Sequence, residues 1–163
     1  MISHAWAKTN RNPVGDPTFA WLSLISHGID VAASLLSLLD GKALDCASEA
    51  AGRPLTERDR QRLAVLALIH DAGKALPRFQ NRIVPDRTRG LLPDHIGPML
   101  DLVEEISGGG WRQDEGGLVA AALDLDGMLG WFGGDVAQLV ESLRVAFAHH
   151  GGLRRPQAAA DLR

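Results

Sequence analysis

Residues 56–74, TERDRQRLAVLALIHDAGK, predict a helix that ends in a histidine–aspartate pair. Thr56, followed three residues later by Asp59, has the signature of a helix start, because a threonine hydroxyl can cap the first free backbone amides. The apolar residues that follow recur at helical spacing: Leu63, Leu66, Ala67 and Ile69. The sequence therefore predicts a helix that carries His70 and Asp71 at its end.

The same periodicity extends along most of the chain. Helical spacing and glycine or proline stops predict further helices over 19–39, 72–81, 95–106 (capped by Asp94), 115–130 and 134–149. Residues 1–18 are interpreted as an extended lead-in, 42–55 as a loop with a short helix, and 82–93 as a basic loop. No stretch alternates with period two, so we expect no sheet. The prediction is an all-α bundle of about five to seven helices, forming one domain over 1–163.

Composition limits the classes of protein that the chain can represent. Its 163 residues are 45% hydrophobic, enough to form a core, and carry a net charge of −3. Nucleic acid would therefore have to be bound by a local patch rather than by a global basic field. The single cysteine fits a reducing compartment, the start does not resemble a signal peptide, and the apolar run 63–69 is too short to cross a bilayer. We expect a cytoplasmic protein without membrane contact.

Histidines are the residues most informative about chemistry. Five of the six lie at or beside predicted helices; any one alone is more often a packed or surface residue than a ligand. Neutral imidazoles with a carboxylate suit first-row divalent ions such as Mn, Fe, Co, Ni or Zn. Cys46 lies outside the set, which excludes a structural thiolate zinc site. The candidate ligands are His27, His70, Asp71, His95, His149 and His150, with Asp71 as the natural bridge between two ions.

Several short motifs together resemble a known family. They are Trp6-Ala-Lys8, His27-Gly-Ile-Asp30, His70-Asp71-Ala-Gly-Lys74, Phe79-Gln80, the isolated His95, and Ala148-His149-His150-Gly151. The chain resembles the HD superfamily of metal-dependent phosphohydrolases. More narrowly, it is similar to the HD nuclease domain of the CRISPR-associated helicase-nuclease of type I interference systems. The resemblance extends over about 5–152.

This resemblance implies a role for each matching residue. One metal would be held by His27, His70 and Asp71, and a second by Asp71, His95, His149 and His150. The ions would lower the pKa of a shared water and orient a phosphate ester. Lys74 would face the scissile phosphate; the alternative is a solvated helix lysine. Asp30 would either orient the ring of His27 or face solvent.

A local excess of positive charge follows the histidine–aspartate pair. Opposed by the single Asp86, it comprises Lys74, Arg78, Arg82, Arg87 and Arg89. Beside a metal site, such a cluster would bind a phosphodiester backbone. The alternative is a solvated loop on an acidic protein.

The resemblance implies a metal-dependent nuclease that cleaves single-stranded DNA together with a helicase domain and a CRISPR surveillance complex. Two alternatives remain open at this point: an HD phosphohydrolase acting on small nucleotides, and a shortened non-catalytic scaffold that binds a partner protein. The family pattern has a further aspartate well beyond the His149-His150 pair, whereas this chain ends at Arg163. We therefore expect the first metal to be bound more weakly than the second.

Overall fold

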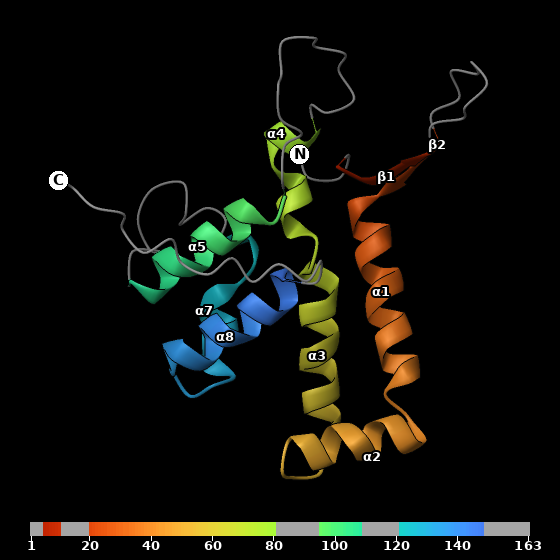
Figure 1. Cartoon of the computed structure of the whole chain (residues 1–163), viewed down its shortest axis with the longest axis vertical. Coiled ribbons are helices and arrows are strands. Elements are labelled where there is room, and N and C mark those ends of the chain that lie inside the picture. The colour runs from red at the N-terminus through yellow and green to blue at the C-terminus, as the bar shows by residue number, and fades with distance from the viewer. Residues whose placement is uncertain (1–4, 11–19, 81–94, 109–120, 149–163) are drawn as a thin grey trace, which may run out of the picture.

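Helices make up most of the computed structural model, which describes residues 5–10, 20–80, 95–108 and 121–148 (Figure 1). The long helices are α1 (Leu24–Leu38), α2 (Gly41–Ala50), α3 (Glu57–Ile69), α5 (Gly97–Ser107) and α8 (Val136–Phe147). Shorter pieces are a 3₁₀ turn (Ala72–Ala75), α4 (Pro77–Gln80) and α7 (Leu125–Gly130). The prediction of an all-α helical bundle is confirmed.

The start of α3 is the one that the sequence predicted. The Thr56 hydroxyl accepts a hydrogen bond from the Asp59 backbone amide, and the Asp59 carboxylate accepts one from the Thr56 amide, which together form a capping box. Arg53 adds an ion pair to Asp59 at 2.7 Å. Helix α3 is thereby fixed at its start, and it carries His70 and Asp71 at its other end.

The main core lies between α5, α7 and α8, with the end of α3 against it. Apolar residues recur every third or fourth position on α5 and α8, as expected for helices that bury one face. Residues with no exposed surface are Val103, Ile106, Leu125, Leu139 and Leu143. Each buried side chain of this size contributes about 1.5–3 kcal/mol relative to an exposed one. Ile69 belongs to the same core, and its packing fixes the end of α3 directly before His70.

A two-stranded hairpin replaces part of the expected lead-in and the expected start of the first helix. Strand β1 (Trp6–Asn10) pairs antiparallel with β2 (Ala20–Ser23), so the prediction of no strands and of a helix from residue 19 was wrong. Helix α1 begins at Leu24 instead, where the Ser23 hydroxyl accepts from the Ser26 amide at 3.0 Å. Backbone pairing between the two strands determines this boundary, and helical periodicity carries no signal for it.

The stretch expected to be mostly loop after α1 is a regular helix, α2. The Asp40 carboxylate caps it by accepting from the Gly41 amide at 2.8 Å, and Gly41 has a φ of +48° that glycine adopts readily. The Asp40-Gly41 pair therefore ends one helix and begins the next. Among the described residues no single helix is long and apolar enough to cross a membrane; α1 and α2 reach that length only as a pair, bent by 91°.

Other helix boundaries also differ from the expectation. The helix expected over 72–81 divides into a 3₁₀ turn and α4, because Leu76 between them is extended. Helix α5 begins at Gly97, with Pro98 in its first turn, so His95 precedes the helix instead of starting it. Helices α7 and α8 lie within the expected 115–130 and 134–149, separated by Gly133 and Gly134 at positive φ. Asp94 and 109–120 lie outside the described residues.

Candidate metal centre

The centre is built around the carboxylate of Asp71, which is 2% exposed at the end of α3. His70 ends the helix, and its Nδ1 lies 2.7 Å from the Ala67 carbonyl oxygen. A carbonyl only accepts, so Nδ1 carries the hydrogen. The other ring nitrogen, Nε2, lies 3.3 Å from Asp71 Oδ2. In the neutral ring Nε2 then has a free electron pair, which is the arrangement that metal-binding histidines use.

Two further histidines reach Asp71 from other parts of the chain. His27 on α1 places its Nε2 3.2 Å from Asp71 Oδ2, and its ring meets that of His70 edge-on at 5.3 Å. His95, just before α5, places its Nε2 3.2 Å from Oδ1. One carboxylate oxygen therefore faces two imidazoles and the other faces a third. This division is what a carboxylate shared between two ions requires.

Lys74 contributes a positive charge to the same centre. It lies one helical turn beyond Asp71, is 9% exposed, and places its Nζ 2.6 Å from Asp71 Oδ2. Its ammonium also lies 5.9 Å from the centre of the Phe79 ring, within the range of a cation–π contact. The burial of Lys74 rules out the alternative of a solvated helix lysine.

The electrostatics of the centre favour an ionised aspartate and act in opposite directions on two of its imidazoles. Burial alone would raise the pKa of Asp71, but hydrogen bonds from His70, His95 and Lys74 outweigh it and hold that pKa well below its usual range. The pKa of His27 is lowered, chiefly because burial disfavours the charged ring. The pKa of His70 is raised, chiefly by its hydrogen bond to Asp71. An ionised carboxylate with imidazoles that can lose their protons is the form that binds a metal.

The donor atoms fit a divalent ion. The ligand atoms of His27, His70 and Asp71 all lie within 4.8 Å of one another. Separations of this size are close to those expected between ligand atoms that each lie about 2.0–2.2 Å from one ion. The set of two nitrogens and one oxygen suits first-row transition ions. The second oxygen of Asp71, beside His95, offers a bridging position.

Aromatic and amide side chains surround the centre on the side of the hairpin. The Phe79 ring packs edge-on against His95 at 5.3 Å, and it packs at a tilt of 37° against Trp6 at 4.9 Å. The Gln80 amide accepts from the Trp6 backbone N–H, donates to the Trp6 carbonyl (both at 3.0 Å), and also donates to the Lys74 carbonyl. From the sequence Trp6, Phe79 and Gln80 were only marks of resemblance. Their packing role joins positions 74 residues apart, which no local pattern reveals.

Several candidate residues have no described place in the structure. His149 and His150 lie outside the described residues, as do Arg82, Arg87 and Arg89. The backbone of Arg78 belongs to α4, but its side chain is not described. Asp30 is exposed on α1. The structure thus brings together His27, His70, Asp71, Lys74 and His95 and leaves the remaining ligands and the basic cluster as expectations.

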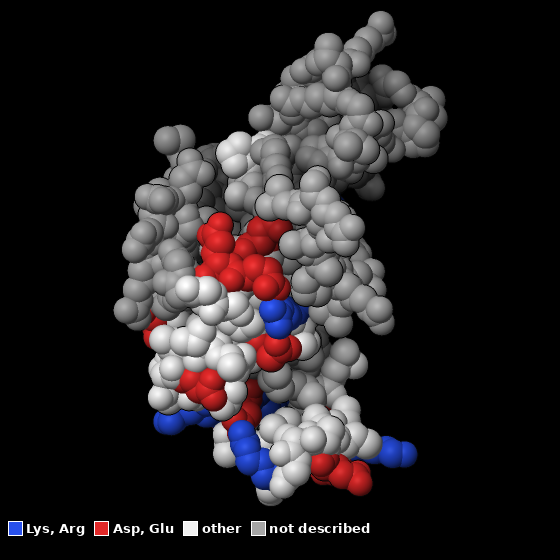
Figure 2. Space-filling view, turned by 60° about the vertical axis from the view of Figure 1, so that its left-hand side comes forward, with Lys and Arg blue, Asp and Glu red and all other residues white. Residues whose placement is uncertain are grey.

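The face formed by α5 and α8 offers no comparable chemistry. Asp and Glu side chains gather on the face shown in Figure 2, and α5 exposes Asp101, Glu104 and Glu105. On α8, Arg144 is already paired with Glu104 at 2.7 Å and with Glu141 at 2.6 Å. Such a surface repels a phosphate backbone.

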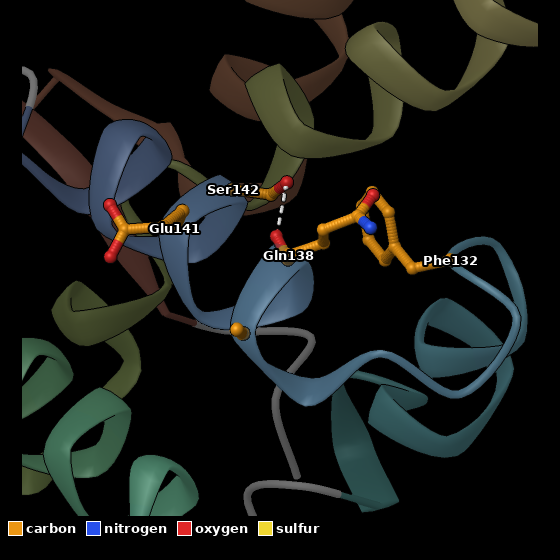
Figure 3. Close-up of a pocket in the computed structure, with 5 residues that line it drawn as sticks. Phe132, Gln138, Glu141 and Ser142 are labelled. Atoms are coloured by element: carbon orange, nitrogen blue, oxygen red, sulfur yellow. Dashed lines mark hydrogen bonds between the residues drawn. The ribbon is translucent and has the colours of Figure 1, made fainter.

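A shallow pocket of about 380 Å³ on α8 is also separate from the centre. Figure 3 shows its lining, which comprises Phe132, Ala137, Gln138, Glu141 and Ser142. The Ser142 hydroxyl donates to the Gln138 carbonyl at 2.8 Å, and the one carboxylate is that of Glu141, which pairs with Arg144. The lining contains no histidine or cysteine beside the Glu141 carboxylate, so it lacks the donor set of a metal site.

A buried aspartate that meets imidazoles from α1, the end of α3 and the segment before α5, on a helical bundle, defines an HD-type site of the metal-dependent hydrolase kind. The chain belongs to the family described as "Cas3, HD domain", whose sequence model matches residues 6–162. This confirms the resemblance to the HD nuclease domain of the type I CRISPR helicase-nuclease. Neither a curated protein nor a solved structure matches the chain significantly.

Proposed function

We propose that this chain is a metal-dependent nuclease domain that cleaves single-stranded DNA in type I CRISPR interference. The observation that carries the proposal is the buried Asp71 carboxylate, which has imidazole nitrogens 3.2–3.3 Å from both of its oxygens. Membership of the Cas3 HD family supports a nucleic-acid substrate and a CRISPR context. The partners in this proposal are a helicase domain and the CRISPR surveillance complex.

The candidate histidines divide between two ions in this proposal. His27, His70 and Asp71 would hold one ion, and Asp71, His95, His149 and His150 would hold the other. When bound, Mn, Fe, Co, Ni or Zn ions lower the pKa of a water and neutralise charge on a phosphodiester. The chain's own contribution is orientation: the hydrogen bond from His70 Nδ1 to Ala67 keeps Nε2 directed at Asp71.

Positive side chains complete the proposed reaction site. Lys74 helps keep Asp71 ionised, and its ammonium stabilises the negative charge that develops on the phosphate. The basic cluster contacts the DNA backbone without reading its sequence, because phosphate contacts carry no base information. Its proposed members are Lys74, Arg78, Arg82, Arg87 and Arg89.

Cleavage assays with Mn²⁺, Co²⁺ and Ni²⁺ test the proposal. We expect cleavage of circular single-stranded DNA, little cleavage of duplex DNA, and a loss of at least about 100-fold in Asp71→Asn, since one carboxylate serves both ions. Asp45→Asn, which changes an exposed carboxylate on α2, is the matched control and should cleave normally. Hydrolysis of free nucleotides in place of DNA would favour a nucleotide phosphohydrolase. Metal binding without any hydrolysis would favour a non-catalytic scaffold that binds a partner protein.

A further inference from the structure

Two buried glycines adjoin the ligands of the centre, one beside His27 and one between Asp71 and Lys74. We propose that Gly28 and Gly73 are positioning residues, which let the segments carrying His27 and His95 approach close enough for both histidines to share Asp71. The inference rests on the proposed metal site. It states that two residues that donate no atom to the metal determine how close the ligands lie to one another.

Gly28 lies on α1 beside the backbone of α3. It is buried, and a Cβ added at this position would lie 2.6 Å from the backbone oxygen of Leu68, two residues before His70. Real Cβ atoms essentially never approach a heavy atom within 3.0 Å. The backbone of α3 cannot rotate aside as a side chain can, so α1 itself would have to move, and His27 would move with it.

Gly73 has the same relation to the segment before α5. A Cβ here would lie 1.9 Å from the His95 carbonyl oxygen and 2.8 Å from Met99 Cγ. Met99 could repack, but the His95 backbone oxygen could not move without displacing the residue whose ring reaches Asp71. The peptide of His95 therefore rests directly on Gly73.

Neither glycine is required by its backbone conformation. The positive-φ glycines among the described residues are Gly41, Gly52, Gly133 and Gly134, and neither Gly28 nor Gly73 belongs to that group. Inside a helix, glycine is less favourable than alanine by about 1 kcal/mol. Gly28 in α1 therefore weakens its own helix, which the close approach of the two backbones offsets. Space for the neighbouring backbone is the property that both positions share.

The size of the displacement decides whether metal binding would be affected. Ordinary van der Waals contact begins at 3.4 Å. Relief of the 2.6 Å contact at Gly28 therefore requires the two backbones to separate by 0.8 Å, and relief of the 1.9 Å contact at Gly73 requires 1.5 Å. Metal–ligand distances tolerate deviations of only about 0.2 Å. Even a fraction of this movement, carried to His27 or His95, would misplace a ligand.

The test compares Gly28→Ala and Gly73→Ala with two control variants. Each chelator-treated protein is titrated with Co²⁺, whose visible absorption reports both affinity and coordination, and its folding is followed by circular dichroism. We expect both variants to lose at least about 10-fold in Co²⁺ affinity and to change the absorption spectrum. Gly130→Ala places its Cβ in open space and should bind as the wild type does. Met128→Ala, in the core on α7, should lower the melting temperature without changing the affinity.

The outcomes separate this inference from the proposed function. If the wild type binds no Co²⁺, the proposed metal site fails. If the wild type binds and folded Gly28→Ala binds equally well, the positioning role alone is overturned. Equal weakening in Met128→Ala would also overturn it, because lost stability would then explain the effect. Should Gly73→Ala fail to fold, Gly28→Ala decides the matter.

Discussion

At the scale of single residues, the chemistry depends on how one carboxylate is shared. Asp71 Oδ2 meets His27, His70 and Lys74, while Oδ1 meets His95. A buried carboxylate is costly unless cations or hydrogen bonds compensate its charge. Lys74 supplies a full positive charge to Oδ2 that does not depend on histidine protonation. The metal and Lys74 are therefore alternative sources of compensation for the same oxygen.

This overlap makes the effect of Lys74→Met depend on metal. In chelator the variant should lose about 3 kcal/mol of unfolding free energy, because it leaves a buried carboxylate without its lysine partner. Saturating Mn²⁺ should recover more stability in the variant than in the wild type, while DNA cleavage falls. Urea unfolding with and without Mn²⁺ measures both. Lys42→Met, an exposed change on α2, should alter neither quantity, and equal Mn²⁺ effects in all three proteins would contradict the argument.

At the scale of secondary-structure elements, the Gln80 side-chain amide connects the hairpin to the centre. The Gln80 side chain pairs with both backbone groups of Trp6, as a neighbouring strand would, and donates to the Lys74 carbonyl as well. Trp6 Nε1 donates to the Gln80 carbonyl at 3.3 Å. Strand β1 is thereby connected to the turn that follows Asp71.

Gln80→Glu should release this connection while preserving side-chain size. Both donated hydrogen bonds disappear, and carboxylate oxygens then face the Trp6 and Lys74 carbonyl oxygens. We expect a loss of about 2 kcal/mol in unfolding free energy. Amide hydrogen exchange should become faster in β1 and β2 before it does in α3. Gln61→Glu, exposed on α3, is the matched control; if it destabilises the protein as much, the loss reflects added negative charge and not the hairpin.

The same elements show what the sequence could predict. The start of α3 was predictable because Thr56 and Asp59 interact within one helical turn. The hairpin was missed because its anchor, Gln80, is 74 residues from Trp6. For 42–55 the sequence predicted a loop with only a short helix, because Gly52 and Pro54 lie just beyond the end of α2. For α3 the decisive contact was local and visible in the sequence, and for the hairpin it was distant and hidden.

The candidate site follows the same rule. Residue types and the resemblance named His27, His70, Asp71 and His95, and the structure places all four together. Which oxygen each imidazole meets depends on packing between elements, and no spacing in the chain encodes it. Gly28 and Gly73 stood only within the motifs of the resemblance, and their positioning role gave no signal, because their backbone angles are ordinary and only the neighbouring backbones explain them.

At the scale of the whole molecule, the centre joins two groups of helices. Helix α1 packs along α3 on one side, and α5 packs on α8 on the other, with α3 in contact with both α1 and α8 (Figure 1). His27 comes from the first group and His95 precedes α5 of the second, while Asp71 ends α3 between them. A metal held by all three would connect the two groups directly.

Metal should therefore stabilise the fold as a whole. A ligand that binds only the folded state adds about 2.7 kcal/mol at 100 times its dissociation constant, so Mn²⁺ at that excess should raise the melting temperature by several degrees. His27→Ala and His95→Ala should each reduce this rise in melting temperature. When amide exchange is measured residue by residue, each variant should also lose the protection that Mn²⁺ gives in both groups of helices. Val140→Ala, in the α8 core, should lower the melting temperature with and without Mn²⁺ by the same amount, since a valine side chain offers no metal-binding atom. A Mn²⁺ effect confined to α1 and α3 would show that His95 does not share the ion-binding carboxylate in solution.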